Sequence, residues 1–150
     1  YMAADSNIIR AACRIQAQST SNPTTSSQWA SIYALNEAER EVHRMTAALD
    51  KRRQYMVTAL NAIPGIQCLM PDGAFYVFAD IQAFLDKQSV SGRLVDSASF
   101  CQNLLQESNV ATVPGSSFGT EGYIRLSYST TMRDIKVGME RIKEWLNGLN

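Results

Sequence analysis

The spacing of apolar residues changes at Pro64-Gly65, and this change restricts the possible folds more than any other feature of the sequence. Before this pair, apolar residues recur every three or four positions, which is the period of an α-helix. After it, short strand-like runs are separated by turn residues and by helical stretches. This order predicts an α+β fold in which helices cover one face of a small sheet with antiparallel pairing.

Three helices are predicted before this pair. The first is capped by Asp5 or Ser6 and runs to about Gln18. Pro23 suits the first turn of a second helix. A long third helix opens near Asn36 and ends at the proline and glycine. The apolar residues expected to form the buried side of the second helix are Trp29, Ile32, Tyr33 and Leu35.

Short strands and two further helices are predicted after the pair. Asp96 is expected to cap one helix, and Thr130 or Thr131 the last one. The turn Pro71-Asp72-Gly73 favours antiparallel pairing of the strands beside it, and Lys87 to Gly92 is expected to be a polar loop. The predicted strands are residues 66–69, 74–78, 110–113 and 123–128.

The composition excludes several classes of protein. The 150 residues include 14 Lys+Arg and 14 Asp+Glu, so the charge excess of a nucleic-acid binder is missing. No apolar run is long enough to span a membrane, so no membrane or nucleic-acid partner is predicted. One histidine and three cysteines without a Cys-x-x-Cys pair predict no metal site. The cysteines are expected to be reduced, packed thiols of an intracellular protein.

The chain begins at Tyr1, without an initiator methionine and without the pattern of a signal peptide. We therefore expect it to be cut from a longer polypeptide.

Arg125 is the first candidate for a binding residue. Strand alternation places it on the same face as Tyr123 and Ser127, with Ile124 and Leu126 on the opposite face. A guanidinium group near a strand end is well shaped to hold a carboxylate through two parallel hydrogen bonds. Spacing alone favours another interpretation, in which this arginine is exposed and pairs with an acidic residue on the surface.

Other segments have a functional and a structural interpretation. Gly73-Ala74-Phe75-Tyr76 forms either an aromatic wall beside a ligand or a hairpin with core aromatics. Gly115 to Gly119 lacks the phosphate-loop spacings, which favours a plain connection over a ligand-binding loop. His43 with Glu39 is expected to be a surface pair, and Lys51-Arg52-Arg53 a solvated helix face.

Four segments, taken together and in this order, resemble the C-terminal part of fold-type I aminotransferases of the pyridoxal-phosphate class I/II family. Among these, bacterial-type aspartate aminotransferases are most similar, and the resemblance extends over essentially the whole chain. The segments are residues 16–23, 73–78, 113–119 and 124–128. The stretch Asp86 to Asp96 departs from the family's pattern and has no role assigned.

The resemblance implies a domain organisation and several site residues. Residues 1–36 would be the end of the large domain with connecting helices, and residues 37–150 the C-terminal small domain, beginning with a long linking helix. Arg125 would bind the substrate α-carboxylate, and Phe75 would lie near the substrate. Ser19 to Asn22 would approach the active site of the neighbouring subunit.

The resemblance also implies where the cofactor chemistry lies. Tyr1 would match the tyrosine that closes the family's W-R-x-G-Y segment, and the Schiff-base lysine and the phosphate-binding arginine would lie upstream of it. The family's aspartate at the pyridine nitrogen would also be missing. We therefore assign no catalytic or cofactor-binding residue. None of Lys51, Lys87, Lys136 and Lys143 follows a serine, as the family's S-K segment requires.

The resulting hypothesis is the C-terminal domain of a pyridoxal 5'-phosphate-dependent aminotransferase, which moves an amino group between an amino acid and a 2-oxo acid. The complete protein is expected to be a cytoplasmic homodimer. This chain alone is expected to be inactive, without covalently bound cofactor, and to expose an apolar surface. One alternative is the aminotransferase-like effector domain of a transcription regulator, which a basic helix-turn-helix would reveal. Another is a stand-alone α+β binding domain whose motifs match by chance.

Overall fold

The computed structural model describes residues 2–149, which pack as two units, one up to Arg44 and one from Met45 onward. The α-helices are α1 (Ser6–Ser19), α2 (Thr25–Glu37), α3 (Glu39–Asn61), α4 (Ser97–Ser108) and α5 (Met132–Asn147). The strands are β1 (Gln67–Cys68), β2 (Tyr76–Asp80), β3 (Gln88–Ser89), β4 (Gly92–Arg93), β5 (Val113–Pro114) and β6 (Tyr123–Ser127). Two short 3-10 helices are η1 (Gln82–Phe84) and η2 (Gly115–Phe118). Over the described residues, none of the helices is both long and apolar enough to cross a membrane.

The first unit consists of α1, α2 and the beginning of α3. Asp5 caps α1, because its carboxylate accepts a 2.8 Å hydrogen bond from the backbone N–H of Asn7. Thr24 caps α2, so Pro23 precedes the cap and does not lie in the first turn as predicted. The start of α3 carries Glu39 and Glu41, whose negative charges suit the positive end of the helix dipole.

The predicted buried side of α2 is wrong. Trp29 is 68% exposed and Leu35 is 87% exposed, and Ile32 and Tyr33 are also exposed. Neither α1 nor α2 contains a buried residue, because no part of the described chain covers their apolar side chains. Helical spacing gave the type of element correctly, but burial requires a covering surface that spacing does not supply.

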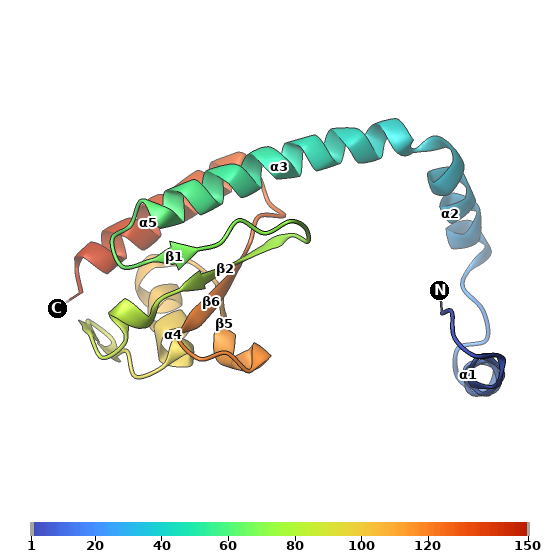
Figure 1. Cartoon of the computed structure of the whole chain (residues 1–150), viewed down its shortest axis with the longest axis horizontal. Helices are drawn as coiled ribbons and strands as arrows, with labels where there is room; N and C mark the ends of the chain where they lie inside the picture. Colours follow the sequence, from blue (N-terminus) through green and yellow to red (C-terminus); the bar gives the residue numbers. More distant parts are fainter. Residues whose placement is uncertain (1, 150) are drawn as a thin grey trace. The chain divides into compact units, whose positions relative to one another are not determined.

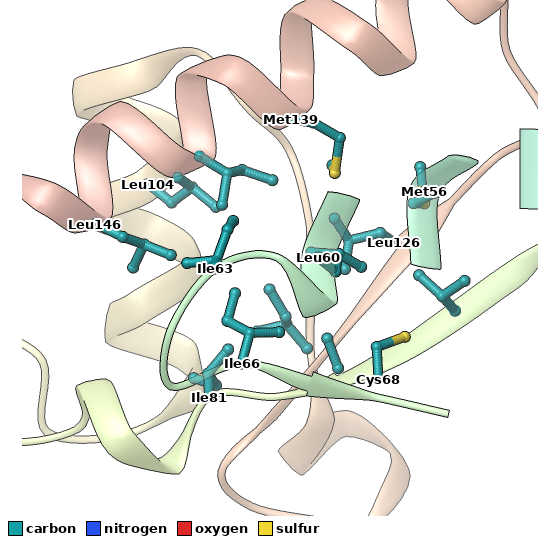
Figure 2. Packing of buried hydrophobic residues seen from close by; sticks show 14 of the residues in the cluster. Met56, Leu60, Ile63, Ile66, Cys68, Ile81, Leu104, Leu126, Met139 and Leu146 are labelled. Carbon is teal, nitrogen blue, oxygen red and sulfur yellow. The ribbon is translucent and has the colours of Figure 1, made fainter. Parts of the chain in front are cut away.

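The second unit contains a four-stranded antiparallel sheet with the order β1-β2-β6-β5 (Figure 1). The central pair aligns Val77 with Leu126 and Ala79 with Ile124, and all four side chains are buried. Helices α3, α4 and α5 supply further residues of this core, among them Leu60, Leu104 and Leu146 (Figure 2). The antiparallel α+β fold predicted from the sequence is confirmed. The residues of the core that Figure 2 labels are Met56, Leu60, Ile63, Ile66, Cys68, Ile81, Leu104, Leu126, Met139 and Leu146.

The stretch that was predicted as a polar loop is a small hairpin of β3 and β4, with Ser89 paired to Gly92. Glu107 on α4 holds this hairpin, because its carboxylate accepts hydrogen bonds from the Ser89 hydroxyl (2.9 Å) and the Ser91 backbone N–H (2.6 Å). The indole N–H of Trp145 on α5 donates to the same carboxylate at 2.6 Å. One acidic side chain therefore joins the hairpin to two helices.

Gly115 begins η2, the turn that leads from β5 back toward β6. A Cβ atom at this position would clash with the carbonyl oxygen of Thr120 and would lie 2.7 Å from that of Tyr123. Only glycine therefore allows the turn to close this tightly on the chain that follows it.

Candidate functional site

Arg125 lies at the centre of β6, on the face of the sheet opposite the core. Its neighbours Ile124 and Leu126 are buried on the core face, so the predicted alternation is confirmed. Phe78 of β2 lies directly across from Arg125, and Val113 of β5 lies on the other side. Two neighbouring strands therefore surround this arginine and leave it half-buried.

Two aromatic rings contact the guanidinium group. Its carbon Cζ lies 4.3 Å from the ring centroid of Tyr76 and 4.5 Å from that of Phe118. These distances are typical of cation–π contacts. The guanidinium is therefore packed against side chains of the fold and does not extend freely into solvent.

Arg125 has no acidic partner among the described residues, and no hydrogen-bond acceptor for its guanidinium is found there. By contrast, Arg53 donates to Asp50 at 2.6 Å and Arg93 to Asp86 at 3.0 Å. The alternative of an arginine paired with a surface acid is therefore wrong for residues 2–149. A half-buried guanidinium whose N–H groups have no protein acceptor is available to an anionic ligand.

A cavity of about 410 Å³ opens beside Arg125. Its charged residues are Arg125 and Asp80, and the rest of its wall is largely apolar or aromatic. Phe78 and Tyr123 stack in this wall with their ring centroids 5.0 Å apart. The negative charge of Asp80, together with burial, raises the pKa of the Tyr123 hydroxyl. The lining residues are Gln67, Leu69, Pro71, Tyr76, Val77, Phe78, Asp80, Tyr123 and Arg125.

Phe75, the second predicted site residue, does not line this cavity. It is 49% exposed and lines a separate hollow together with residues of α3 and the turn before β2. Its neighbour Tyr76 points toward Arg125 instead. Sequence reasoning missed Tyr76, although alternation along β2 and antiparallel pairing with β6 together place Tyr76 on the arginine's face.

Phe118 was also missed. It belongs to the segment that was predicted as a plain connection, and its position depends on the tight turn at Gly115. The spacing of apolar residues does not identify Phe118, because a 3-10 turn of four residues is too short to show a periodic pattern. The only signal was its place between the glycines of the segment Gly115 to Gly119.

The turn that carries Phe75 and leads into β2 is held from two sides. Tyr128, which follows β6, donates its hydroxyl to the carbonyl of Ala74 at 2.8 Å and its backbone N–H to the carbonyl of Phe75 at 2.9 Å. Arg53 of α3 donates to the carbonyl of Pro71. Ala74 has a φ of 65°, a conformation that costs energy for a residue with a Cβ atom. The hydrogen bonds offset this cost and fix the turn.

Other residues singled out in the sequence lie elsewhere. Tyr1 is outside the described residues, and Ser19 to Asn22 form the exposed end of α1 and the connection after it. No lysine lines the cavity beside Arg125. Lys136 instead lies with its Nζ atom 5.8 Å from the ring centroid of Tyr55. Within residues 2–149, no group of three or more His, Cys, Asp or Glu side chains is arranged to hold a metal ion.

Comparison with known proteins gives consistent results. Residues 1–142 match the family model for aminotransferase class I and II. An aspartate/prephenate aminotransferase of Nitrosomonas europaea is 40% identical over 98% of the chain, and an aspartate aminotransferase of Rhizobium meliloti is 40% identical over 90%. The chain spans only 38% and 33% of the length of these two relatives.

Solved structures agree in fold. The crystal structure of an aspartate aminotransferase from Rhizobium meliloti superposes with a TM-score of 0.90 and 39% identity, covering 96% of this chain and 36% of that one. An aromatic aminotransferase from Pyrococcus horikoshii gives 0.85 at 34% identity, covering 97% and 37%. An alanine aminotransferase from Pyrococcus furiosus gives 0.81 at 27% identity, covering 95% and 35%. The chain therefore corresponds to about a third of each of these structures.

Proposed function

The chain belongs to the aminotransferase class I and II family, and from this we propose that it is the C-terminal part of an enzyme that moves an amino group between an amino acid and a 2-oxo acid. Aspartate is the proposed amino-acid substrate, because the relatives of highest identity reported above carry aspartate in their names. The transcription-regulator alternative is not favoured, since those relatives are all named as aminotransferases.

The single observation that supports this proposal most strongly is the state of Arg125. Its guanidinium group is half-buried, lies beside a cavity and has no acidic partner in the described chain. Such a group is suited to bind a carboxylate through two parallel hydrogen bonds. An amino acid held by its α-carboxylate in this way has a restricted orientation, and orientation contributes strongly to the rate of a reaction.

Family membership implies dependence on pyridoxal phosphate in general. The residues of this chain do not fit a covalent site for that cofactor, because the cavity with Arg125 has no lysine in its wall. We propose that the groups that hold the cofactor belong to the portion of the relatives that this chain does not cover. The part of the chain described here would bind and orient the substrate.

The remaining assignments are also proposals. Residues 1–36 would complete the large domain, and residues 37–150 would form the small domain. Ser19 to Asn22 would approach the second subunit of a homodimer, and Phe75 would border the substrate from the turn before β2. The complete protein would act in the cytoplasm on small-molecule amino acids and 2-oxo acids, without a membrane or nucleic-acid partner.

A chimera tests the proposed function directly. Residues 1–150 replace the matching segment of the Rhizobium meliloti aspartate aminotransferase, and amino transfer from L-aspartate to a 2-oxo acid is measured. We expect activity in the chimera, and neither activity nor a borohydride-reducible pyridoxal-phosphate adduct in the isolated chain. A folded chimera without transfer activity, or a specific lysine adduct in the isolated chain, would contradict the proposal.

A further inference from the structure

We propose that Tyr76 and Phe118, here called the aromatic clamp, are positioning residues that hold the guanidinium of Arg125 ready for a carboxylate. This inference rests on the proposed function, because it takes Arg125 as the carboxylate-binding residue. It goes further by assigning a role to two residues that act through the arginine.

The two rings reach Arg125 from different parts of the fold. Tyr76 belongs to β2, which pairs with one edge of β6, and Phe118 belongs to η2, which follows the strand paired with the other edge. Their ring centroids lie 4.3 Å and 4.5 Å from Cζ of Arg125. A cation at this distance from an aromatic ring is attracted by the negative charge of the ring face.

The aromatic clamp is itself supported by neighbouring rings. Phe118 contacts Phe78 edge to face, with centroids 6.4 Å apart and an angle of 83° between the ring planes. Phe78 in turn stacks on Tyr123 at 5.0 Å and 8°. Both are preferred geometries for aromatic pairs. Phe118 therefore has a defined place although it lies on a short turn.

Contacts through the rings leave the hydrogen-bonding capacity of the arginine intact. The five N–H bonds of a guanidinium lie in its plane, whereas a ring attracts it without accepting a conventional hydrogen bond from that plane. The aromatic clamp therefore restricts the side chain without competing with a carboxylate. An acidic neighbour would hold the arginine equally well but would occupy the N–H groups that the substrate needs.

Restriction of the arginine affects substrate binding in a defined way. A free arginine side chain has many rotamers, and ordering it costs free energy on binding. When the binding-competent arrangement is only partly populated, the apparent dissociation constant rises by the inverse of that population. Loss of either ring should therefore raise KM, with a smaller effect on kcat, because a bound carboxylate fixes the guanidinium through two hydrogen bonds.

Steady-state kinetics of the chimera test the aromatic clamp, with L-aspartate as the probe. Tyr76→Leu and Phe118→Leu are each expected to raise KM about three- to tenfold with less than a threefold change in kcat. Tyr76→Phe keeps the ring and should recover most of the affinity that Tyr76→Leu loses. Tyr55→Leu is the matched control, since it removes a ring from another cation–π contact, that with Lys136, and should leave KM within about twofold.

Nuclear magnetic resonance of the 150-residue chain provides a readout that does not depend on activity. Hydrogens near an aromatic ring are shifted by its ring current, so the Nε–H resonance of Arg125 should move in Tyr76→Leu and in Phe118→Leu. It should not move in Tyr55→Leu. The backbone amide spectrum of each variant shows whether the fold is kept, so a folding defect is separated from a loss of contact.

The outcomes distinguish the inference from the proposed function. If both leucine variants fold and leave KM and the Nε–H resonance unchanged while Arg125→Lys raises KM, the aromatic clamp is wrong and the role of Arg125 stands. If Arg125→Lys also leaves KM unchanged, both fail. If Tyr76→Phe is as impaired as Tyr76→Leu, the hydroxyl and not the ring is responsible, which also overturns the inference.

Discussion

At the scale of single residues, the proposed role of Arg125 depends on the planar geometry of its guanidinium group. A lysine at this position would keep the positive charge but would lose the two parallel donors. In the chimera, we expect Arg125→Lys to lower kcat/KM for L-aspartate about tenfold or more, which corresponds to ~1.4 kcal/mol or more of transition-state stabilisation. Arg93→Lys is the control, because Arg93 is exposed and paired with Asp86. Equal kinetics for the two variants would remove Arg125 from the site.

Glu107 is expected to stabilise the β3–β4 hairpin through its hydrogen bonds with Ser89 and Ser91. In Glu107→Gln, an NH2 group replaces one carboxylate oxygen and faces a donor, either the Trp145 indole or the donors from Ser89 and Ser91. The expected loss in free energy of unfolding is about 1–3 kcal/mol, measured by urea denaturation at pH 7. Glu140→Gln is the control on the exposed side of α5. A loss no larger than that of the control would show that the hairpin does not need this carboxylate.

The same carboxylate predicts a dependence of stability on pH. Burial acts to raise the pKa of Glu107, but the hydrogen bonds from Ser91, Trp145 and Ser89 outweigh it and lower the pKa to about 2. Because the folded-state pKa lies below the unfolded value, this contribution is complete above about pH 4.5 and is lost as the pH falls toward 2. We therefore expect the stability difference between the parent chain and Glu107→Gln to shrink over that range. A stability difference that stays constant as the pH falls from 4.5 toward 2 would contradict the lowered pKa of Glu107.

At the scale of elements, the turn between β1 and β2 is held by Tyr128, a residue far away in sequence that follows β6. Tyr128→Phe removes the hydrogen bond to the carbonyl of Ala74. That carbonyl belongs to an exposed residue and can bind water, so we expect a loss of only ~1 kcal/mol in free energy of unfolding. Hydrogen exchange of the backbone amides in residues 72–76 should become faster. The exposed Tyr33→Phe serves as the control, and unchanged exchange in Tyr128→Phe would show that the other contacts suffice.

Some features of the elements could be predicted from the sequence, and others could not. Alternation placed Arg125 on the correct face of β6, and Asp96 caps α4 as predicted, because both features depend on neighbours within a few residues. The hairpin of β3 and β4 was missed, since it is held by Glu107, 18 residues away from Ser89. Sequence reasoning missed Phe118 for the same reason, because its contact with Arg125 arises only when the sheet is assembled.

At the scale of the whole molecule, the two units differ in what stabilises them. No residue of α1 or α2 is buried, whereas the second unit has a continuous hydrophobic core. Isolated helices of this length are marginal in water without packing. In hydrogen exchange of the 150-residue chain, we expect the amides of α1 and α2 to be roughly 100-fold less protected than those of α4 and β6. Equal protection would show that the first unit is covered in solution.

The exposed apolar side chains of α2 are consistent with the expectation that the chain presents a surface for a further part of the protein. They also disfavour the alternative of a stand-alone binding domain, which would need to cover Trp29 and Leu35. The chain spans 38% of its Nitrosomonas europaea relative, which agrees with this view. On the proposed function, the described residues would form one component of an active site.

The tight turn at Gly115 has a consequence for how this site can change in evolution. Any larger residue there would push the backbone away from Thr120 and Tyr123, and Phe118, three positions later, would be carried outward with it. Arg125 would then keep its guanidinium group, but the contact with Phe118 that restricts its orientation would be lost. A survey of variants limited to the residues that line the cavity would overlook this defect, because Gly115 is not among them and its replacement leaves every charge in place.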